Sequence, residues 1–534
     1  MGARDFACLT LILVASALVA CRSSVPTTPT PDGEPAPPGA TSTSGARMAT
    51  GEPAPTPSPQ FRVDWDDRAI FRQGLVDAAQ GTLDRLPGAS VYHITLHIPD
   101  DFRLLEGHEN VLYTNQEDEP LDEVCFRLFP NINGGEVRVS AVRVDGREVE
   151  PVYEYRHSLL RVPLPVALQP GQRVDVQMDF ELRAARTREA DLHYGYGLLG
   201  YFEGVLGLDG FYPVIPVYDD EGWNVEIPPP NKGDITCLDA SFYLVRVTAP
   251  ASLTVVASGV RVGHESDGDA QVVTFAAGPA RDFYLAASAD YTVVSETVGE
   301  TTVNSYAFTE RADEARLALR YAADALRVYS ARLGVYPYTE LDVVSAPLRW
   351  TGLEYPGLAL VDTSLYEPDE SGSSAESLAQ NWLERTVVHE VAHQWFYNVV
   401  GNDQIDEPWL DEALVTYLTG PYYAEMYGDD VAQEYFALRY ERWDSIDRAS
   451  IPIGMSARAY ADDEYVPIIY SRGPLFVRAL AQEMGQDVFD EFLRDYYESH
   501  QWGIGTGDAF KQLAEQHCRC DLTALFEEWV YEER

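Results

Sequence analysis

Lysine is almost absent from this chain of 534 residues, since Lys232 and Lys511 are its two lysines. Lysine and arginine together number 39, against 85 aspartates and glutamates, which gives a formal net charge of -46. A surface this poor in positive charge repels phosphate backbones and anionic lipid headgroups. The composition therefore argues against nucleic-acid binding and against membrane attachment through a basic patch. We interpret the acidic surface as a solvated shell suited to an extracellular or salty setting.

Long hydrophobic runs are also lacking, so the sequence predicts no transmembrane helix. The apolar stretch at residues 9–20 is too short to cross a bilayer but has the length of a signal-peptide core. Residues 18–21, Leu-Val-Ala-Cys, resemble the bacterial lipobox, in which the cysteine becomes the lipidated first residue of the mature chain. We therefore expect residues 1–21 to be a lipoprotein signal peptide and the protein to be extracytoplasmic, lipid-anchored to a bacterial membrane through Cys21. The alternative is an ordinary cleaved signal followed by a chance cysteine.

Cysteines are few, and four would remain after removal of the signal and acylation of Cys21: Cys125, Cys237, Cys518 and Cys520. Export permits disulfides, and four cysteines allow three pairings, which the sequence leaves open. Residues 517–520, His-Cys-Arg-Cys, lack a second ligand pair at the spacing of a zinc finger. We therefore expect no structural metal site in this run.

The chain is too long for a single core, and its sequence pattern changes along its length. Residues 22–62 are rich in Pro, Ser, Thr, Gly and Ala, which predicts a disordered linker. A short helical segment is expected at residues 63–88. Alternating apolar and polar residues between clusters of turn residues predict an antiparallel β domain at residues 89–302. Residues 303–534 form a mainly helical domain with a few strands, so the fold class is α+β with several domains.

Within the second half, the sequence predicts the following helices and strands: a helix at residues 313–333, strands at 340–346 and 358–361, and helices at about 377–399, 407–427, 471–484, 487–498 and 507–516.

The strongest chemical signal is the run His389-Glu390-Val-Ala-His393. Residues four apart share one face of a helix, so both imidazoles can reach one ion while Glu390 lies beside it. Zinc in a catalytic site takes a third protein ligand and leaves one position for water. Glu412 follows after an interval long enough to finish the helix, turn and start an antiparallel helix, with Pro408 in its first turn. We predict one Zn²⁺ held by His389, His393 and Glu412, with Glu390 as the proton acceptor.

This spacing resembles the aminopeptidase N family of gluzincins, which includes the leukotriene A hydrolase relatives. Two further motifs occur in the family's order. Residues 352–356, Gly-Leu-Glu-Tyr-Pro, resemble the family's Gly-x-Met-Glu-Asn stretch, and residues 470–473, Tyr-Ser-Arg-Gly, resemble its Tyr-x-Lys/Arg-Gly motif. The likeness extends from about residue 90 to the end of the chain. It implies a β domain followed by a thermolysin-like catalytic domain.

The resemblance also implies roles for single residues. Glu354 would lie on an edge strand and bind the free α-ammonium group of the substrate, as a charge-assisted pair. The backbone at Gly352 would bind the extended peptide. Tyr470 would donate its phenolic proton to the developing oxyanion. The implied activity is that of a zinc-dependent aminopeptidase acting on peptides.

Two departures from the family pattern affect these expectations. The usual Asn-Glu-Gly around the third ligand is here Asp411-Glu412-Ala413. Asp411 could accept a hydrogen bond from a ligand imidazole or compensate the N-terminal dipole of its helix, and the sequence does not choose. The stretch after Glu412 is too short for the large C-terminal helical domain of longer relatives, so we expect a more open cleft. An endopeptidase and a catalytically idle peptide-binding protein are therefore the alternatives.

Overall fold

The computed structural model describes residues 64–185, 198–230, 232–233, 237–367, 378–448 and 450–531. The predicted signal peptide at 1–21, with Cys21, and the predicted linker at 22–62 lie outside the described residues. The described part begins with two short 3₁₀ helices, η2 (Ala69–Gly74) and η3 (Asp77–Asp84), in the segment where the sequence predicts a short helix. Within the described ranges, no helix is both long and apolar enough to span a membrane.

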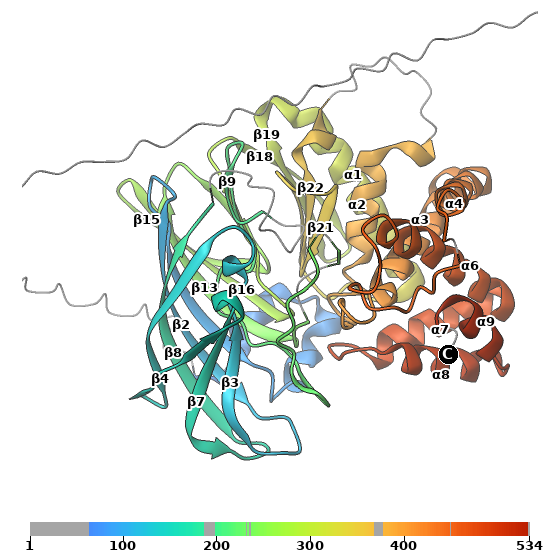
Figure 1. The fold of residues 1–534 in the computed structure, drawn as a ribbon. Coiled ribbons are helices and arrows are strands. Elements are labelled where there is room, and N and C mark those ends of the chain that lie inside the picture. The colour runs from blue at the N-terminus through green and yellow to red at the C-terminus, as the bar shows by residue number, and fades with distance from the viewer. Residues whose placement is uncertain are drawn as a thin grey trace, which may run out of the picture. The chain divides into compact units, whose positions relative to one another are not determined.

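The first half of the described chain is built around one eight-stranded sheet (Figure 1). In spatial order its strands are β15 (Val260–Asp267), β16 (Ala270–Ala280), β13 (Ser241–Pro250), β1 (Val91–His97), β2 (Leu104–Thr114), β8 (Arg173–Arg183), β4 (Glu136–Val144) and β5 (Arg147–Glu148). The neighbouring strands are antiparallel, as the sequence predicts, except that β1 and β13 run parallel. In β8 the apolar residues alternate with polar ones and are the buried ones, so the period-two pattern places one face of the strand in the core.

Three smaller sheets complete this half. They consist of β3 (Leu121–Arg127), β7 (Leu159–Leu168) and β6 (Val152–Glu154); of β14 (Thr254–Ala257), β17 (Leu285–Ser288), β10 (Val205–Leu208) and β9 (Gly200–Phe202); and of the short pair β11 (Tyr218–Asp219) and β12 (Gly222–Trp223).

The second half starts with a mixed five-stranded sheet in the order β18 (Tyr291–Val298), β19 (Thr301–Phe308), β20 (Glu340–Ala346), β22 (Leu358–Asp362) and β21 (Gly352–Tyr355). Strand β21 is therefore an edge strand. The predicted boundary between residues 302 and 303 lies inside β19, whose sheet continues into the helical half, and the division into domains stays a prediction. Helices α1 (Ala312–Leu333) and α2 (Trp382–Ala392) pack against this sheet (Figure 1).

The remaining helices follow β22 in the chain. They are α3 (Trp409–Tyr427), α4 (Asp429–Asp444), α5 (Tyr465–Pro467), the π-helix η9 (Ile468–Arg472), α6 (Gly473–Met484), α7 (Gln486–Ser499), α8 (Gly507–Cys518) and α9 (Thr523–Trp529). Helix α4 has no counterpart among the helices that the sequence predicts. Helix α2 is shorter than predicted, because it ends at Ala392 rather than near residue 399.

A buried arginine connects the two halves close to the end of α2. Arg281 directly follows β16 and donates hydrogen bonds from Nε to the Tyr397 carbonyl (2.7 Å), from Nη2 to the Gly503 carbonyl (2.6 Å) and from Nη1 to the Leu238 carbonyl (2.9 Å). The side chain is 2% exposed. Because buried carbonyls need partners, this one guanidinium fixes the irregular segment that follows the helix of the predicted zinc motif.

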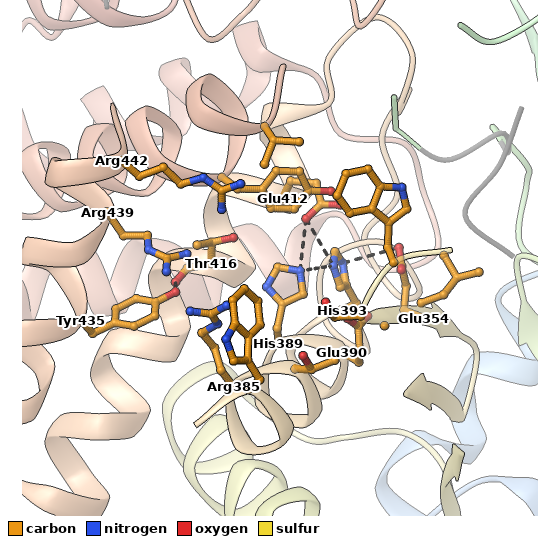
Figure 2. A pocket seen from close by; sticks show the side chains of 18 residues that line it. Glu354, Arg385, His389, Glu390, His393, Glu412, Thr416, Tyr435, Arg439 and Arg442 are labelled. Atoms are coloured by element: carbon orange, nitrogen blue, oxygen red, sulfur yellow. Dashed lines mark hydrogen bonds and ion pairs between the residues drawn. The ribbon is translucent and has the colours of Figure 1, made fainter. Parts of the chain in front are cut away.

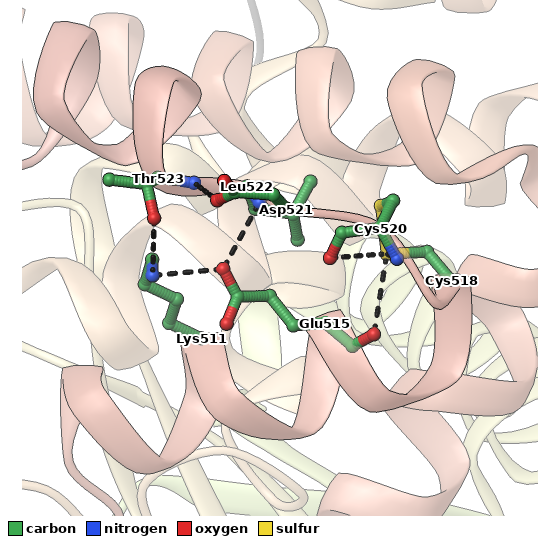
Figure 3. The surroundings of a disulfide bond; sticks show 7 residues. All are labelled: Lys511, Glu515, Cys518, Cys520, Asp521, Leu522 and Thr523. Carbon is green, nitrogen blue, oxygen red and sulfur yellow. Dashed lines mark hydrogen bonds and ion pairs between the residues drawn. A yellow bond between two sulfur atoms is a disulfide. The ribbon is translucent and has the colours of Figure 1, made fainter.

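The cysteines resolve into one pair and two single residues. Cys518 and Cys520 form a disulfide at the end of α8, while Cys125 and Cys237 are buried free thiols. Next to the disulfide, Glu515 pairs with Lys511 (Oε1 to Nζ, 2.9 Å) and accepts a hydrogen bond from the backbone of α9's N-cap residue (Figure 3). The disulfide agrees with the expectation that residues 517–520 are not a structural metal site.

Candidate active site

Helix α2 carries the first two residues of the candidate metal site. The side chain of Asn381 caps its N-terminus by accepting a hydrogen bond from the Glu384 backbone N–H at 3.2 Å. One helical turn then separates His389 from His393, and the helix ends so that His393 is its C-cap residue. The His389 side chain is 16% exposed and that of His393 is 1% exposed. Their Nε2 atoms lie 3.2 Å apart, which is close enough for both to bind one ion.

Helix α3 supplies the third residue from its first turn. Glu412 Oε2 lies 3.2 Å from Nε2 of His389 and 3.7 Å from Nε2 of His393 (Figure 2). The helix starts at Trp409 after Pro408, a residue that suits a helix start because it needs no hydrogen-bond partner for its nitrogen. The structure therefore brings together the three residues that the sequence assigns to the metal.

These three donor atoms fit a tetrahedral zinc ion. Bonds of about 2.0–2.1 Å place the ligand atoms of such an ion about 3.3 Å apart, and the observed separations are 3.2, 3.2 and 3.7 Å. Glu412 Oε2 is a buried oxygen whose contacts within the described part of the chain are with the two imidazoles. Two imidazole nitrogens and one carboxylate oxygen are also the ligand types that zinc takes in catalytic sites.

Neighbouring groups orient these ligands. His393 Nδ1 lies 3.1 Å from the Phe396 carbonyl, which leaves Nε2 to face the candidate site. The Tyr470 hydroxyl donates a hydrogen bond of 2.6 Å to Glu412 Oε1, which leaves Oε2 for a metal. Burial alone would raise the pKa of Glu412, but hydrogen bonds from His389 and His393 outweigh it, so the pKa is lowered and the carboxyl group stays ionised.

The Asp411 side chain accepts its hydrogen bonds from groups other than the ligand imidazoles. Its Oδ2 accepts a hydrogen bond from Gln404 Nε2 at 3.0 Å, and its Oδ1 accepts one from the Glu412 backbone N–H at 2.7 Å. The second bond satisfies a free N–H group in the first turn of α3. Burial and the neighbouring Glu412 raise the pKa of Asp411. The imidazole partner found for His393 is the Phe396 carbonyl instead.

Glu390 lines the same pocket as the three ligand residues. Its carboxylate lies against Gly352, the first residue of β21, where a Cβ atom would be 2.1 Å from Glu390 Oε1. A side chain at position 352 would therefore have to displace the Glu390 carboxylate and Thr386. The structure thus places Glu390 between the candidate metal ligands and the edge strand.

Glu354 follows on the same edge strand and faces the site. Its Oε1 lies 3.7 Å from His393 Nδ1, and the residue is 5% exposed. Gln394, which the sequence did not single out, holds this strand and the following turn onto α2. Its side chain donates to the Tyr355 carbonyl (3.0 Å) and accepts from the Gly357 backbone N–H (2.9 Å). In the sequence, the position of this glutamine directly after the second histidine of the motif could have marked it as a residue that supports the site.

Tyr470 lies in the π-helix η9, between α5 and α6. Its ring centroid is 6.2 Å from that of His389, and its hydroxyl contacts Glu412 as described above. π-Helical turns are rare and occur mostly at functional sites. All the site residues predicted for metal, catalysis and substrate binding therefore line one pocket, whereas Cys21 lies outside the described residues.

The pocket has a volume of about 250 Å³ and contains residues that the sequence did not predict. Three of them are arginines, Arg385 on α2 and Arg439 and Arg442 on α4 (Figure 2). Two exposed tryptophans, Trp350 and Trp382, also line it. The two arginines on α4 were not predicted as pocket residues because α4 was not predicted as a helix.

Comparisons with known proteins agree with this geometry. The β domain and the mixed sheet precede two successive helices that carry the three candidate ligand residues. Residues 317–529 match the Peptidase family M1 domain. This match agrees with the resemblance of the sequence motifs to the aminopeptidase N family of gluzincins.

Several curated proteins are similar to the chain. It is 27% identical to aminopeptidase 2 of Candida albicans over 274 residues, which cover 49% of this chain and 29% of that protein. It is 24% identical to aminopeptidase M1 of Arabidopsis thaliana over 330 residues, which cover 58% and 37%. It is 22% identical to human endoplasmic reticulum aminopeptidase 2 over 398 residues, which cover 71% and 39%. The chain thus spans less than two fifths of the length of these relatives.

The fold is shared with a solved structure of an M1 zinc metallopeptidase from Deinococcus radiodurans. The TM-score is 0.60 at 22% sequence identity, and the match covers 83% of this chain and 93% of that chain. At this identity the likeness establishes the fold, which confirms the predicted order of a β domain followed by a mainly helical domain.

Proposed function

We propose that the protein is a zinc-dependent aminopeptidase that hydrolyses peptide bonds next to free N-termini. The observation that carries this proposal is the position of Glu354, whose carboxylate lies 3.7 Å from His393 in the pocket of the three ligand atoms. A carboxylate so close to the reacting centre can bind an α-ammonium group there. The names of the similar curated proteins, all aminopeptidases, support the same activity. So does a variant of the Deinococcus metallopeptidase that is bound to the substrate Tyr-Ser-Ala.

His389, His393 and Glu412 would hold the zinc ion. When bound there, zinc supplies Lewis acidity, which polarises a carbonyl group and lowers the pKa of a water molecule. The charge on the ion also requires both imidazoles to be neutral. Burial lowers the pKa of His389, which favours that state, whereas the carboxylates of Glu354 and Glu412 outweigh burial and raise the pKa of His393 while no cation is present.

The chain's own residues would carry out the remaining steps. Glu390 would accept a proton from the attacking water and deliver it to the leaving amine. The Tyr470 hydroxyl would donate a hydrogen bond to the oxyanion as the carbonyl carbon becomes tetrahedral. Glu354 would hold the ammonium group, and the backbone at Gly352 would bind the extended peptide. Each of these residues lines the pocket.

The place of action is part of the proposal. We propose that the chain works outside the cytoplasm, tethered through a lipid on Cys21, and acts on peptides there. The sequence of residues 18–21 supports this. The disulfide between Cys518 and Cys520 supports an oxidising compartment. Mass spectrometry of the N-terminal peptide from a membrane fraction tests it, because an unmodified cysteine or a different N-terminus would contradict the anchor.

The activity is tested with a pair of substrates that differ at one group. An alanyl anilide with a free amine should be cleaved, and its N-acetyl form should be cleaved at least about tenfold more slowly, because acetylation removes the charge that Glu354 binds. In Glu354→Gln this ratio should fall toward one. Glu390→Gln, which keeps the size of the side chain, should abolish turnover while zinc stays bound. Equal cleavage of both substrates would indicate an endopeptidase, and peptide binding without turnover would indicate an idle binding protein.

A further inference from the structure

Three arginines line one end of the pocket, in a chain whose acidic residues outnumber its basic ones 85 to 39. They are Arg385, Arg439 and Arg442, named here the arginine cluster. Figure 2 shows this cluster on one side of the ligand histidines and Glu354 on the other side. The pocket therefore has a positive end, which the proposed catalytic residues do not use.

The fold brings these side chains together from two helices. Arg385 precedes His389 by four residues on α2, so the two side chains share a face of that helix. Arg439 and Arg442 are three residues apart on α4, and α4 packs against α3, the helix of Glu412. The cluster thus lies on α2, the helix of the two candidate ligand histidines, and on α4, which packs against the helix of Glu412.

One hydrogen bond fixes the register of these helices beside the site. The Tyr435 hydroxyl on α4 donates to the Thr416 carbonyl on α3 at 2.9 Å. Thr416 lies one turn after Glu412, and Arg439 lies one turn after Tyr435 with its guanidinium 4.9 Å from the centre of that ring. The contact between α3 and α4 and the stacking of Arg439 on Tyr435 therefore hold Arg439 in a fixed position relative to Glu412.

The positive charge of the cluster is not compensated by the described part of the chain. Within the described ranges, none of the three arginines forms an ion pair or a hydrogen bond with a carboxylate. Arg385 stacks on Trp382 at 3.5 Å, and the Nε atom of Arg439, a residue that is 7% exposed, is buried without a hydrogen-bond partner. Burial and the charge of Arg439 lower the pKa of Arg385 to about 10. A buried guanidinium nitrogen without a partner is unfavourable, so an anion at this end would stabilise Arg439.

The rest of the pocket has the opposite charge, because Glu354, Glu390 and Glu412 line it. A pocket of about 250 Å³ is smaller than the range of about 300–1,000 Å³ that is typical for drug-sized ligands. A small molecule with an ammonium group at one end and a carboxylate at the other matches this distribution of charge. A short peptide is such a molecule.

We propose that the arginine cluster binds a carboxylate on the part of the substrate beyond the cleaved bond, and that short peptides with this carboxylate are the preferred substrates. The inference rests on the proposed aminopeptidase function. The carboxylate could be the C-terminal α-carboxylate of a dipeptide or tripeptide, or an acidic side chain. Both sources present the same planar group to which guanidinium groups bind with paired hydrogen bonds.

Two pairs of substrates distinguish the C-terminal α-carboxylate from an acidic side chain. The value of kcat/KM is measured for Ala-Ala-Ala as the free acid and as the C-terminal amide, and for the amides of Ala-Ala-Glu and Ala-Ala-Gln. The inference predicts at least about a tenfold preference for the carboxylate-bearing member of one pair. A preference in the first pair assigns the α-carboxylate, and a preference in the second assigns the side chain. Equal values within both pairs would overturn the inference.

Variants then connect the preference to the cluster. In Arg442→Gln the preference should fall several-fold, mainly through KM, because a uniform binding contact is lost. Arg442 is exposed, so this substitution leaves the core intact, and Arg385→Gln provides a second test from the other helix. The matched control is Arg316→Gln, an arginine on α1 with a 61% exposed side chain outside the pocket, which should keep the wild-type preference. A preference that survives in both Arg442→Gln and Arg385→Gln would overturn the assignment.

Anilide cleavage and a binding measurement together distinguish failure of this inference from failure of the proposed function. Alanyl anilide carries no carboxylate, so its cleavage reports the aminopeptidase activity alone. If the anilide is cleaved but the acid and amide tripeptides are cleaved equally, the inference fails and the function stands. If the anilide is not cleaved, calorimetry with the zinc-loaded protein still decides the inference. Tighter binding of the Ala-Ala-Ala acid than of its amide supports the arginine cluster, and equal binding contradicts it.

Discussion

Gly352 and Glu390 are in such close contact that a Cβ atom on residue 352 would lie 2.1 Å from Glu390 Oε1. The same atom would lie 2.6 Å from Cγ2 of Thr386, one turn earlier on α2. The edge strand and the helix of the metal ligands therefore approach each other at a residue without a side chain. This contact fixes the distance between the strand that would bind substrate and the carboxylate that would move the proton.

Gly352→Ala should therefore lower activity without removing the metal. The added methyl group must push Glu390 or the strand away, and a displacement of about 1 Å in an active site can reduce the rate about 100-fold. We expect kcat on alanyl anilide to fall by about 10- to 100-fold while zinc content and the melting temperature stay near wild type. Unchanged kcat would show that the contact does not position Glu390.

Tyr470→Phe removes one hydroxyl and keeps the ring. If this hydroxyl stabilises the oxyanion, kcat should fall by about 100- to 1,000-fold with little change in KM, as when an oxyanion-hole donor is removed. Tyr440→Phe on α4 is the control, because that tyrosine is 53% exposed and does not line the pocket. Steady-state kinetics of both variants decide the matter, and a change confined to KM would assign Tyr470 to ground-state binding instead.

Arg281→Met should destabilise the fold. The substitution leaves the buried carbonyls of Leu238, Tyr397 and Gly503 without their donor, and each carbonyl left unsatisfied costs about 1–3 kcal/mol. Urea unfolding measures this change. The control is Arg246→Met, because Arg246 pairs with the exposed Glu265 at 3.8 Å and such a pair contributes about 1 kcal/mol or less. Equal effects of the two substitutions would contradict the role of Arg281 between the two halves.

The lowered pKa of His93 should make the free energy of unfolding depend on pH. Burial, together with the charge of Arg68, lowers the pKa of His93 from 6.5 to about 4, and its ring stacks on Trp65 at 4.3 Å. Between pH 6.5 and 4 the unfolded chain takes up a proton that the folded chain does not, so the free energy of unfolding falls as the pH falls. This residue alone accounts for a loss of up to about 3 kcal/mol.

The His93 contribution is measured as a difference. The free energy of unfolding of wild type minus that of His93→Gln should decrease between pH 6.5 and 4 and stay constant above pH 7. A difference that does not change with pH would show that His93 titrates alike in both states. Taking the difference removes the contributions of the many carboxylates that titrate in the same range.

Local patterns in the sequence predict much of the site. The spacing of His389 and His393 follows from the helical period, so their common face could be read directly. The strand at residues 340–346 was predicted with the bounds of β20, and the helix at 313–333 matches α1 within one residue. Glu412 could be predicted as the third ligand because it lies in the first turn of the next helix after His393. These features depend on residues that are near one another in the chain.

Long-range contacts explain what the sequence does not predict. Helix α2 ends before the segment in which the Tyr397 carbonyl accepts a hydrogen bond from Arg281, a residue 116 positions earlier in the chain. Strand β18 lies within the predicted β domain and the predicted boundary cuts β19, yet β18 pairs with β19, and β19 pairs with β20 in the sheet of the second half. Helix α4 had helix signals in Asp429 and Asp430 of its first turn and Arg442 of its last, but its apolar residues form no clear stripe. The arginine cluster was missed together with that helix.

Zinc analysis of two proteins tests the central claim that His389, His393 and Glu412 hold one ion. Wild type and Glu412→Ala are dialysed against the same buffered concentration of free zinc, and bound metal is measured by mass spectrometry, with Glu354→Ala as the control from the same pocket. We predict about one zinc ion per chain for wild type and for Glu354→Ala, and a small fraction of one for Glu412→Ala. Wild type without zinc, or Glu412→Ala with a full ion, would contradict the account.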